Sequence, residues 1–259
     1  MLDPRLVHME KRCISVSALS SGSHVIHFAD GSTYEADLVI GADGIKSVIR
    51  EFVTGRPTSL VYSNSIAYRS VVSPEALKGV KTDMMRPLCW IGKDKVRAAW
   101  GEDASLILKE MKNPSKWYLH FLHPPLSSYI RQRVVLVGDA AHAMLPHLGS
   151  GVGQGFEDVY ALCSLLGDAR ARQCYLDDAL RAYDSIRVVR ANMVQKMSIV
   201  TGDIYERRGP TGGTNAQVRE QLRDMYHPIW HHDLKGEVKR TVAHVYGARG
   251  VLESVDLCL

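Results

Sequence analysis

The sequence lacks a long apolar run and a regular cysteine motif. No stretch of its 259 residues approaches the length of about 18 apolar residues that suggests a membrane-spanning helix. The charged N-terminal segment also lacks the apolar core of a secretory signal. The five cysteines are an odd number without a C-x-x-C pair, so they indicate reduced thiols rather than a disulfide framework. We therefore expect an intracellular protein, cytoplasmic by default, with no membrane span.

Charge of one sign is not concentrated anywhere in the chain. Lys and Arg number 32 against 28 Asp and Glu, which gives a formal net charge of +4, and no block of like charge occurs. This pattern gives little support to nucleic-acid binding. Hydrophobic residues at 46% and charged residues at 23% are typical of globular proteins, and 259 residues can bury a substantial core. An enzyme-like body is therefore the default interpretation.

Both standard phosphate-binding loops are missing, since neither G-x-G-x-x-G nor G-x-x-x-x-G-K-[ST] occurs. The chain carries instead 134-VVLVGDAAHAMLPHLGSGVGQGFEDVY-160. A buried strand is predicted at 133–137, an acid follows at Asp139, and alternating glycines precede a helix predicted at 156–166. Glycines before a helix expose its free N–H groups to a ligand, while an acid at a strand end can accept hydrogen bonds from hydroxyls. The combination favours a flavin over a nucleotide phosphate.

Short β-like runs between turn residues are typical of the first part of the chain. From Cys13 onward the sequence predicts two strands and a third that ends at Gly41, and this third strand is apolar enough to be covered on both faces of a parallel sheet. The other predicted elements are a helix beginning at Ile45, β-like pieces at 65–72 and 87–92 in a strand-rich module, a short helix before the turn at Asn113, and a long helix from Leu176 to about Thr201.

Two motifs resemble those of a known family. The segment 138-GDAAHAMLPHLGSGVGQGFED-158 closely resembles the second flavin-binding motif of the FAD-dependent aromatic hydroxylases, the group A flavoprotein monooxygenases. The segment 37-DLVIGADGIKSVIR-50 resembles that family's Asp-Gly motif, in which Ser and Arg follow on a helix. Four further pieces, AYR, MKNPSKW, LHPPLSSY and PIWHHDL, are similar to the salicylate-hydroxylase-like branch.

The resemblance implies an α/β fold, α+β overall. We expect a partial three-layer FAD/NAD(P)-binding fold with a reduced strand-rich substrate module and C-terminal helices. It divides the chain into a remnant of the FAD-binding domain at 1–55, a shortened β-rich substrate module at 56–125, the second part of the FAD-binding domain at 126–209, and a C-terminal segment at 210–259.

The same resemblance implies roles for individual residues. Asp139 would contact the ribityl chain of FAD, and Val152 would lie under the isoalloxazine edge with its N–H facing the ring. Pro146 would line the flavin face near the substrate. The remaining implied cofactor contacts are Gly41, Asp43, Gly44, Gly138, Gly149 and Gly151. For Asp43 the simpler interpretation is a turn residue, since Asp-Gly turns are common.

For substrate, the resemblance implies that Arg69 holds a carboxylate or phenolate, with Tyr68 as its neighbour. An ion pair within its own sheet is the alternative for Arg69. No metal site is proposed, because His142 and His147 stand five apart in a loop, which is poor spacing for zinc ligands.

The implied activity is that of an FAD-dependent monooxygenase that hydroxylates a small phenol or salicylate-like aromatic with NAD(P)H and O2, in aromatic catabolism or secondary metabolism. The family begins with a βαβ unit carrying G-x-G-x-x-G and continues after the segment at 92–100 with more strands, and the sequence contains neither. The first alternative is therefore a truncated, non-catalytic remnant with weak or no FAD binding. A flavin-linked reductase that yields only hydrogen peroxide is the second. Oligomeric state is left open.

Overall fold

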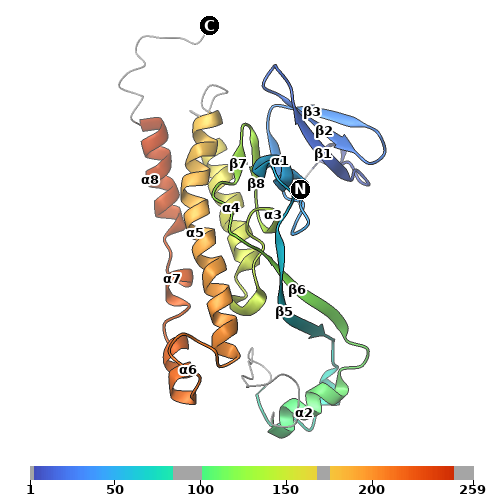
Figure 1. Ribbon diagram of the computed structural model, residues 1–259, viewed down its shortest axis with the longest axis vertical. Helices are drawn as coiled ribbons and strands as arrows, with labels where there is room; N and C mark the ends of the chain where they lie inside the picture. Colours follow the sequence, from blue (N-terminus) through green and yellow to red (C-terminus); the bar gives the residue numbers. More distant parts are fainter. Residues whose placement is uncertain (1–2, 84–100, 168–175, 248–259) are drawn as a thin grey trace.

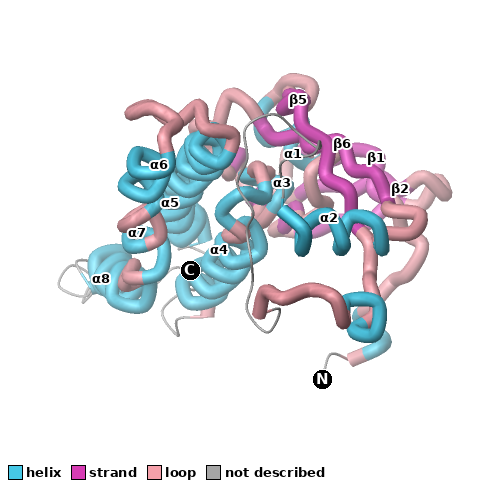
Figure 2. Tube along the Cα trace, turned by 90° about the horizontal axis from the view of Figure 1, so that it is seen from below, coloured by secondary structure: helices cyan, strands magenta, loops and turns pink. Residues whose placement is uncertain are grey.

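The computed structural model describes residues 3–83, 101–167 and 176–247. A layer of long helices lies along one side of the molecule, small β-sheets lie beside it, and a two-stranded ribbon extends away from this body (Figure 1). Seen from below, the helices from α4 to α8 gather on one side and the strands on the other (Figure 2). The mixed α/β class predicted from the sequence is confirmed.

The first sheet is an antiparallel meander of β1 (Cys13–Ala18), β2 (His24–Phe28) and β3 (Thr33–Ala36), preceded by the short 3-10 helix η1 (Pro4–Leu6). Its two turns contain Gly22 and Gly31, whose φ angles of 91° and 81° favour glycine. The third strand expected to end at Gly41 is confirmed as the separate strand β4, whereas β3 was not predicted. The chain leaves the meander after Ala36, and β3 and β4 pair in different sheets.

The second sheet has the order β4-β8-β7, with β4 at Val39–Gly41, β7 at Ile130–Arg131 and β8 at Val134–Leu136. β4 and β8 are parallel although about 90 residues separate them, as their nearly continuous apolar sequences predicted. All three residues of β8 are fully buried. Helix α1 (Ile49–Thr54) covers this sheet and begins four residues after the predicted start at Ile45.

The extended ribbon consists of β5 (Leu60–Arg69) and β6 (Ser115–Leu122), with η2 (Pro74–Leu77) and α2 (Gly101–Glu110) at its far end (Figure 1). The short helix before Asn113 is confirmed as α2, whereas β6 was not predicted. Most of β6 is exposed on both faces, so its sequence does not alternate between apolar and polar residues. The β-like piece at 87–92 lies outside the described residues.

The helical part begins with α3 (Asp139–His142) and η3 (Pro146–Leu148), which lead into α4 (Gly151–Leu166). α4 starts five residues before the predicted Phe156, so the glycines form its first turn and not a preceding loop. The long helix is confirmed as α5 (Leu176–Tyr205). The C-terminal helices are α6 (Asn215–Leu222), α7 (His227–Trp230) and α8 (Leu234–Gly247), and α8 packs against both α4 and α5.

The core lies where β8, α4 and α5 meet. Leu136, Leu165 and Tyr183 are fully buried there, and the Tyr183 hydroxyl donates a 2.8 Å hydrogen bond to the Leu136 carbonyl. This packing fixes the strand end from which the two motifs project. The four-part domain division stays a prediction. Within the described ranges, no helix has the length and apolar character needed to cross a membrane.

Candidate functional site

The turn at the end of β8 brings the predicted acid to the surface. Gly138 adopts φ 61° and ψ −143°, a backbone conformation that L side chains rarely tolerate. Asp139 follows as the first residue of α3 and is exposed. Its side chain makes no hydrogen bond to any residue that the structure describes. The carboxylate is therefore available to accept hydrogen bonds from the hydroxyls of a ligand.

The first turn of α4 presents unused N–H groups. The first N–H in this turn to donate to a helical carbonyl is that of Gln154, which reaches Ser150 at 2.9 Å, and Ser150 makes no side-chain cap. The N–H groups of the three residues before Gln154 therefore have no intrahelical acceptor. Val152 is 74% exposed, and a Cβ built on Gly153 would meet nothing within 4 Å. Open space, free donors and the positive end of a helix dipole together form a cradle for a ligand that accepts hydrogen bonds and develops negative charge.

Asp43 in the first motif caps a helix. Its carboxylate accepts hydrogen bonds from the N–H groups of Val48 (2.7 Å) and Ile49 (3.2 Å) and from the Ser47 hydroxyl (2.5 Å). Gly41 packs tightly, since a Cβ there would approach Ile49 and Leu136 side-chain atoms to 2.8 and 2.9 Å. These contacts are structural, and the cofactor roles of Gly41, Asp43 and Gly44 stay predictions.

Arg50 connects the two motifs directly. Its side chain is almost fully buried at 1% exposure, and it donates to the carbonyls of Asp139 (3.2 Å) and Ala140 (2.8 Å) and also to the carbonyl of Ile45. Burial lowers the pKa of its guanidinium. The Arg that the motif pattern placed on a helix therefore holds the Asp139 turn from the side of α1.

A buried ionic cluster holds the same turn from the other side. Asp158 of α4 is fully buried, and its Oδ2 accepts hydrogen bonds from the Gly138 N–H (2.8 Å) and from His142 Nε2 (2.6 Å). Its Oδ1 accepts one from Arg187 Nε (2.7 Å). Burial by itself would raise the pKa of Asp158, but the His142 hydrogen bond and the Arg187 charge lower it below its usual value.

Sequence reasoning missed this cluster. His142 was weighed only as a metal ligand, and Asp158 and Arg187 were given no role. The one available signal was the Glu157-Asp158 pair within an otherwise apolar helix, which predicts cationic partners on a neighbouring helix. Within the described ranges, no group of three or more His, Cys, Asp or Glu residues could hold a metal ion.

A cavity of about 200 Å³ is lined in part by Leu145 and His147, which come shortly before α4 in the sequence. It is lined by residues 61–65 of β5, Phe121, Leu145, His147, and residues of α5 and beyond, namely Ile199, Gly202, Asp203, Glu206 and Arg208. A Cβ on Gly202 would come within 2.6 Å of His147 Cδ2, so the glycine allows the imidazole to lie against α5. Burial lowers the pKa of His147, although the nearby Glu206 and Asp203 charges oppose the shift.

The structure places the predicted substrate residues elsewhere. Arg69 and Tyr68 are exposed at the last two positions of β5, and the Arg69 guanidinium lies 5.3 Å from the centre of the Trp117 ring. Neither residue lines the His147 cavity. Pro146 is exposed at the first position of η3, close in sequence to the α4 cradle. Their functional roles stay predictions.

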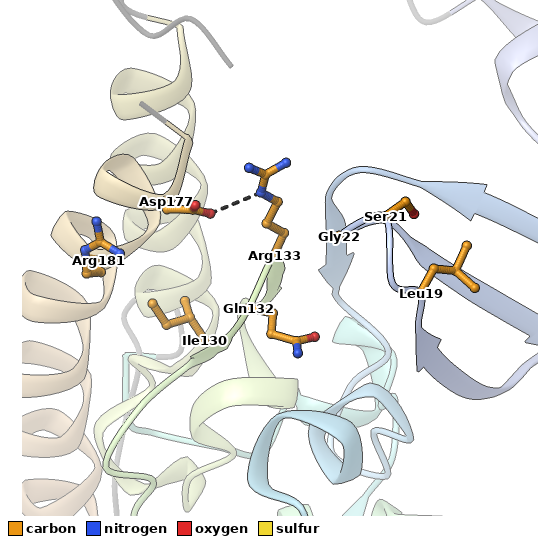
Figure 3. A pocket seen from close by; sticks show the side chains of 8 residues that line it. All are labelled: Leu19, Ser21, Gly22, Ile130, Gln132, Arg133, Asp177 and Arg181. Atoms are coloured by element: carbon orange, nitrogen blue, oxygen red, sulfur yellow. Dashed lines mark hydrogen bonds and ion pairs between the residues drawn. The ribbon is translucent and has the colours of Figure 1, made fainter. Parts of the chain in front are cut away.

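A second cavity, of about 500 Å³, lies between the β1–β2 turn, the β7–β8 hairpin and the start of α5 (Figure 3). Arg133 donates to Asp177 at 3.1 Å on its wall, and Arg181 forms an ion pair with Asp178. Because both guanidinium groups have carboxylate partners, we assign no ligand to this cavity.

Comparisons with known proteins identify the family of this chain. A model of the FAD binding domain family matches residues 92–198. Two salicylate hydroxylases of Pseudomonas putida are 34% and 33% identical to the chain over 89% and 90% of its length, and the matches cover 67% and 66% of those proteins. The chain belongs to the FAD-dependent aromatic hydroxylases, in their salicylate-hydroxylase-like branch.

Two solved structures agree with this chain in fold. A salicylate hydroxylase in a substrate complex superposes with a TM-score of 0.76 at 29% identity, over 89% of this chain and 70% of that one. HpxO of Klebsiella pneumoniae, complexed with FAD and uric acid, superposes with a TM-score of 0.62 at 20% identity, over 91% of this chain and 66% of that one. At that identity the second likeness shows the fold alone.

The chain spans about two thirds of the length of these hydroxylases. The alignment to the first extends over 292 residues although it uses 89% of a 259-residue chain. The relative therefore has residues inside the aligned span that this chain does not, in line with the missing strands expected from the sequence.

Proposed function

We propose that the chain binds FAD between the Gly138–Asp139 turn and the first turn of α4, and that it acts as an FAD-dependent monooxygenase on a small aromatic acid or phenol, with NAD(P)H and O2. The observation that carries this proposal is the cradle itself. The exposed carboxylate of Asp139 forms no hydrogen bond with the described residues, and Val152 and Gly153 expose free N–H groups beside open space. Family membership supports the same assignment.

The residues around the cradle would divide the work of holding FAD. Asp139 would accept hydrogen bonds from ribityl hydroxyls, and the Val152 N–H would face the pyrimidine side of the ring. The helix N-terminus would stabilise negative charge that develops there. The other proposed cofactor contacts are Gly138, Gly149, Gly151, Gly41, Asp43, Gly44 and Pro146. When bound, FAD would supply the redox chemistry, in which it is reduced by NAD(P)H and one oxygen atom of O2 is transferred to the substrate.

We place the aromatic substrate in the cavity at His147. Its volume of about 200 Å³ suits a single ring, and Tyr62, Phe121 and Leu145 give it apolar walls. Because burial lowers the pKa of His147, its imidazole is neutral near pH 7 and can accept a phenol proton. Arg69 and Tyr68 are further proposed substrate contacts, and only the resemblance of AYR to the family supports them.

The metabolic role and the cellular location of the chain belong to the same proposal. Fungal relatives such as the FAD-dependent monooxygenase pigN of Monascus ruber, 28% identical over 84% of this chain and 63% of that protein, support a role in secondary metabolism. The odd number of cysteines, interpreted as reduced thiols, supports a cytoplasmic location.

The visible spectrum of the purified chain, as isolated and after addition of FAD, tests the proposal. Bound FAD with an altered spectrum and quenched fluorescence is expected. NAD(P)H-dependent O2 uptake with salicylate and simple phenols then tests the activity, and a hydroxylated product distinguishes a monooxygenase from a reductase that yields only hydrogen peroxide. A colourless chain that leaves added FAD free would favour the non-catalytic alternative.

A further inference from the structure

The Asp158 cluster touches both halves of the proposed flavin cradle. Its carboxylate holds the start of the Asp139 turn through the Gly138 N–H and the end of that turn through His142. Arg187, which Asp158 binds, donates from Nη2 to the main-chain carbonyl of Gln154 (3.2 Å) and to its side-chain oxygen (2.9 Å). Gln154 directly follows the three residues whose N–H groups are free.

The cluster is closed to solvent and its charges are paired, although the buried His142 Nδ1 makes no hydrogen bond within the described residues. The side chains of His142, Asp158 and Arg187 are all 0% exposed. Glu157 accepts from Arg187 Nη1 (2.6 Å) and also pairs with Arg190 (3.1 Å), so each charge has an opposite partner. A buried network of this kind is costly to disturb and holds its members in one arrangement. It therefore fixes the separation between the turn and the helix terminus.

We propose that Asp158 is a positioning residue of the flavin site, acting with His142 and Arg187 to set the Asp139 carboxylate at a fixed place relative to the first turn of α4. This inference rests on the proposed FAD site. Asp158 itself does not face the cradle, because both of its oxygens are used inside the core. Its effect on FAD passes through the Gly138 N–H and through Gln154.

Asp158→Asn is the sharpest test because it keeps the size of the side chain. An amide has only one acceptor oxygen. If that oxygen faces Gly138 and His142, the NH2 group points at the Arg187 Nε–H, and if it faces Arg187, the NH2 group points at the Gly138 N–H. The variant therefore cannot satisfy both sides of the cluster.

Asp184→Asn is the matched control. Asp184 lies on α5, is half-buried, and accepts a main-chain hydrogen bond from Tyr129 N–H at 2.5 Å, but it touches no part of the cradle. The substitution makes the same chemical change, carboxylate to amide, at a comparable main-chain contact. A general weakening of the core would affect both variants.

The measurement is the dissociation constant of FAD, obtained by fluorescence quenching under conditions where circular dichroism shows each full-length variant to be folded. For a chain that is already fully folded, a loss of global stability leaves the affinity unchanged. We expect D158N to bind FAD about tenfold or more weakly than the wild type, because the cradle loses its fixed geometry. D184N is expected to bind like the wild type.

Equal affinities for wild type and D158N would overturn the inference alone, and so would an equal loss in D158N and D184N. A wild-type chain that does not bind FAD would overturn the proposed function, and this inference with it. If D158N does not fold, His142→Phe replaces it, since it keeps an aromatic ring at this position and removes the Nε2 donor. A loss of about threefold or more is then expected, and wild-type affinity in H142F would contradict the inference.

Discussion

The guanidinium group of Arg50 donates a 2.8 Å hydrogen bond to the main-chain carbonyl of Ala140, which lies 90 residues later in the chain. Two motifs that are remote in the sequence are therefore held together by one buried side chain. The same Nη1 also donates to the Asp139 carbonyl, and Nη2 donates to the Ile45 carbonyl, so the two terminal nitrogens of the guanidinium join the two motifs. The position of Asp139 thus depends on a residue of the other motif.

Arg50→Met should destabilise the protein strongly. It leaves the carbonyls of Ile45, Asp139 and Ala140 without this donor, and the free energy of unfolding is expected to fall by about 2–4 kcal/mol. Urea denaturation measures the change. Arg131→Met is the matched control, because Arg131 is exposed and donates a single bond to the Phe52 carbonyl, so its loss should be within about 1 kcal/mol. Similar losses in both variants would contradict the clamp.

Asp139→Ala should separate cofactor affinity from stability. Asp139 is exposed and forms no side-chain hydrogen bond within the described part of the chain, so the free energy of unfolding should change by less than about 0.5 kcal/mol. FAD affinity should fall about tenfold, because the proposed hydrogen bonds to the ribityl hydroxyls are lost. Urea denaturation and FAD titration measure the two effects. Unchanged affinity would remove Asp139 from the cofactor site.

Asp43→Ala should lower the stability of the folded chain. Asp43 caps α1 through the N–H groups of Val48 and Ile49, and loss of such a cap lowers the free energy of unfolding by about 1 kcal/mol. Asp43→Asn keeps one acceptor oxygen at the same distance from the main chain and should recover part of this loss. The FAD affinity of the folded D43N variant tests the predicted cofactor contact, because the charge is lost there while a capping oxygen is kept. A D43A variant as stable as wild type would refute the capping role.

The sequence predicted those parts of the fold in which local pattern and final environment coincide. β4 and β8 are apolar because both are covered, and α5 repeats its apolar residues with helical spacing. The start of α4 was missed because Gly151, Gly153 and Gly155 have low helix propensity, while the packing of α4 on α5 outweighs it. β6 was missed because its partner β5 lies about 50 residues earlier and most of the strand is exposed.

The candidate site divides in the same way. Asp139 and the glycines after it were identified because their local order matches a family motif. Asp158, Arg187 and Arg50 were not assigned their contacts, since each acts by binding a group that is between 20 and 90 residues away in the chain. A single sequence lists these side chains but does not show which of them meet.

Acid should destabilise the folded chain partly through the Asp158 cluster. Burial opposes ionisation of Glu157 as well, but its bonds and charges with Arg190 and Arg187 lower its pKa, as His142 and Arg187 lower that of Asp158. A carboxyl group with a lowered folded pKa contributes stability that is present above its unfolded pKa of about 4 and is lost as pH falls toward the folded pKa. The urea concentration at the unfolding midpoint of the wild type should therefore decrease as the pH falls below about 5.

Two variants should change the steepness of this pH dependence in opposite directions. D158N lacks the titrating group, so its midpoint should fall less steeply with acid than that of the wild type. Burial raises the pKa of Asp184, so protonation of this residue favours the folded state as pH falls, and D184N should lose stability more steeply. Parallel curves for the wild type and both variants between pH values of about 6 and 3 would contradict the assignment.

Gly153→Ala should raise stability and lower FAD affinity in the same molecule. Gly153 lies in the first turn of α4 with nothing within 4 Å of the site of a Cβ, so alanine fits without a clash and should stabilise the helix by up to about 1 kcal/mol. The added methyl group would occupy the open space proposed for the flavin ring, so the dissociation constant of FAD should rise about tenfold. Gly155→Ala is a comparison and not a neutral control, because its Cβ would meet the Cα of Gly138, itself a proposed cofactor contact, at 3.6 Å. Urea denaturation and FAD titration of both variants measure the two effects. A G153A chain that is more stable and still binds FAD like the wild type would mean that the flavin ring does not lie on the open face of α4.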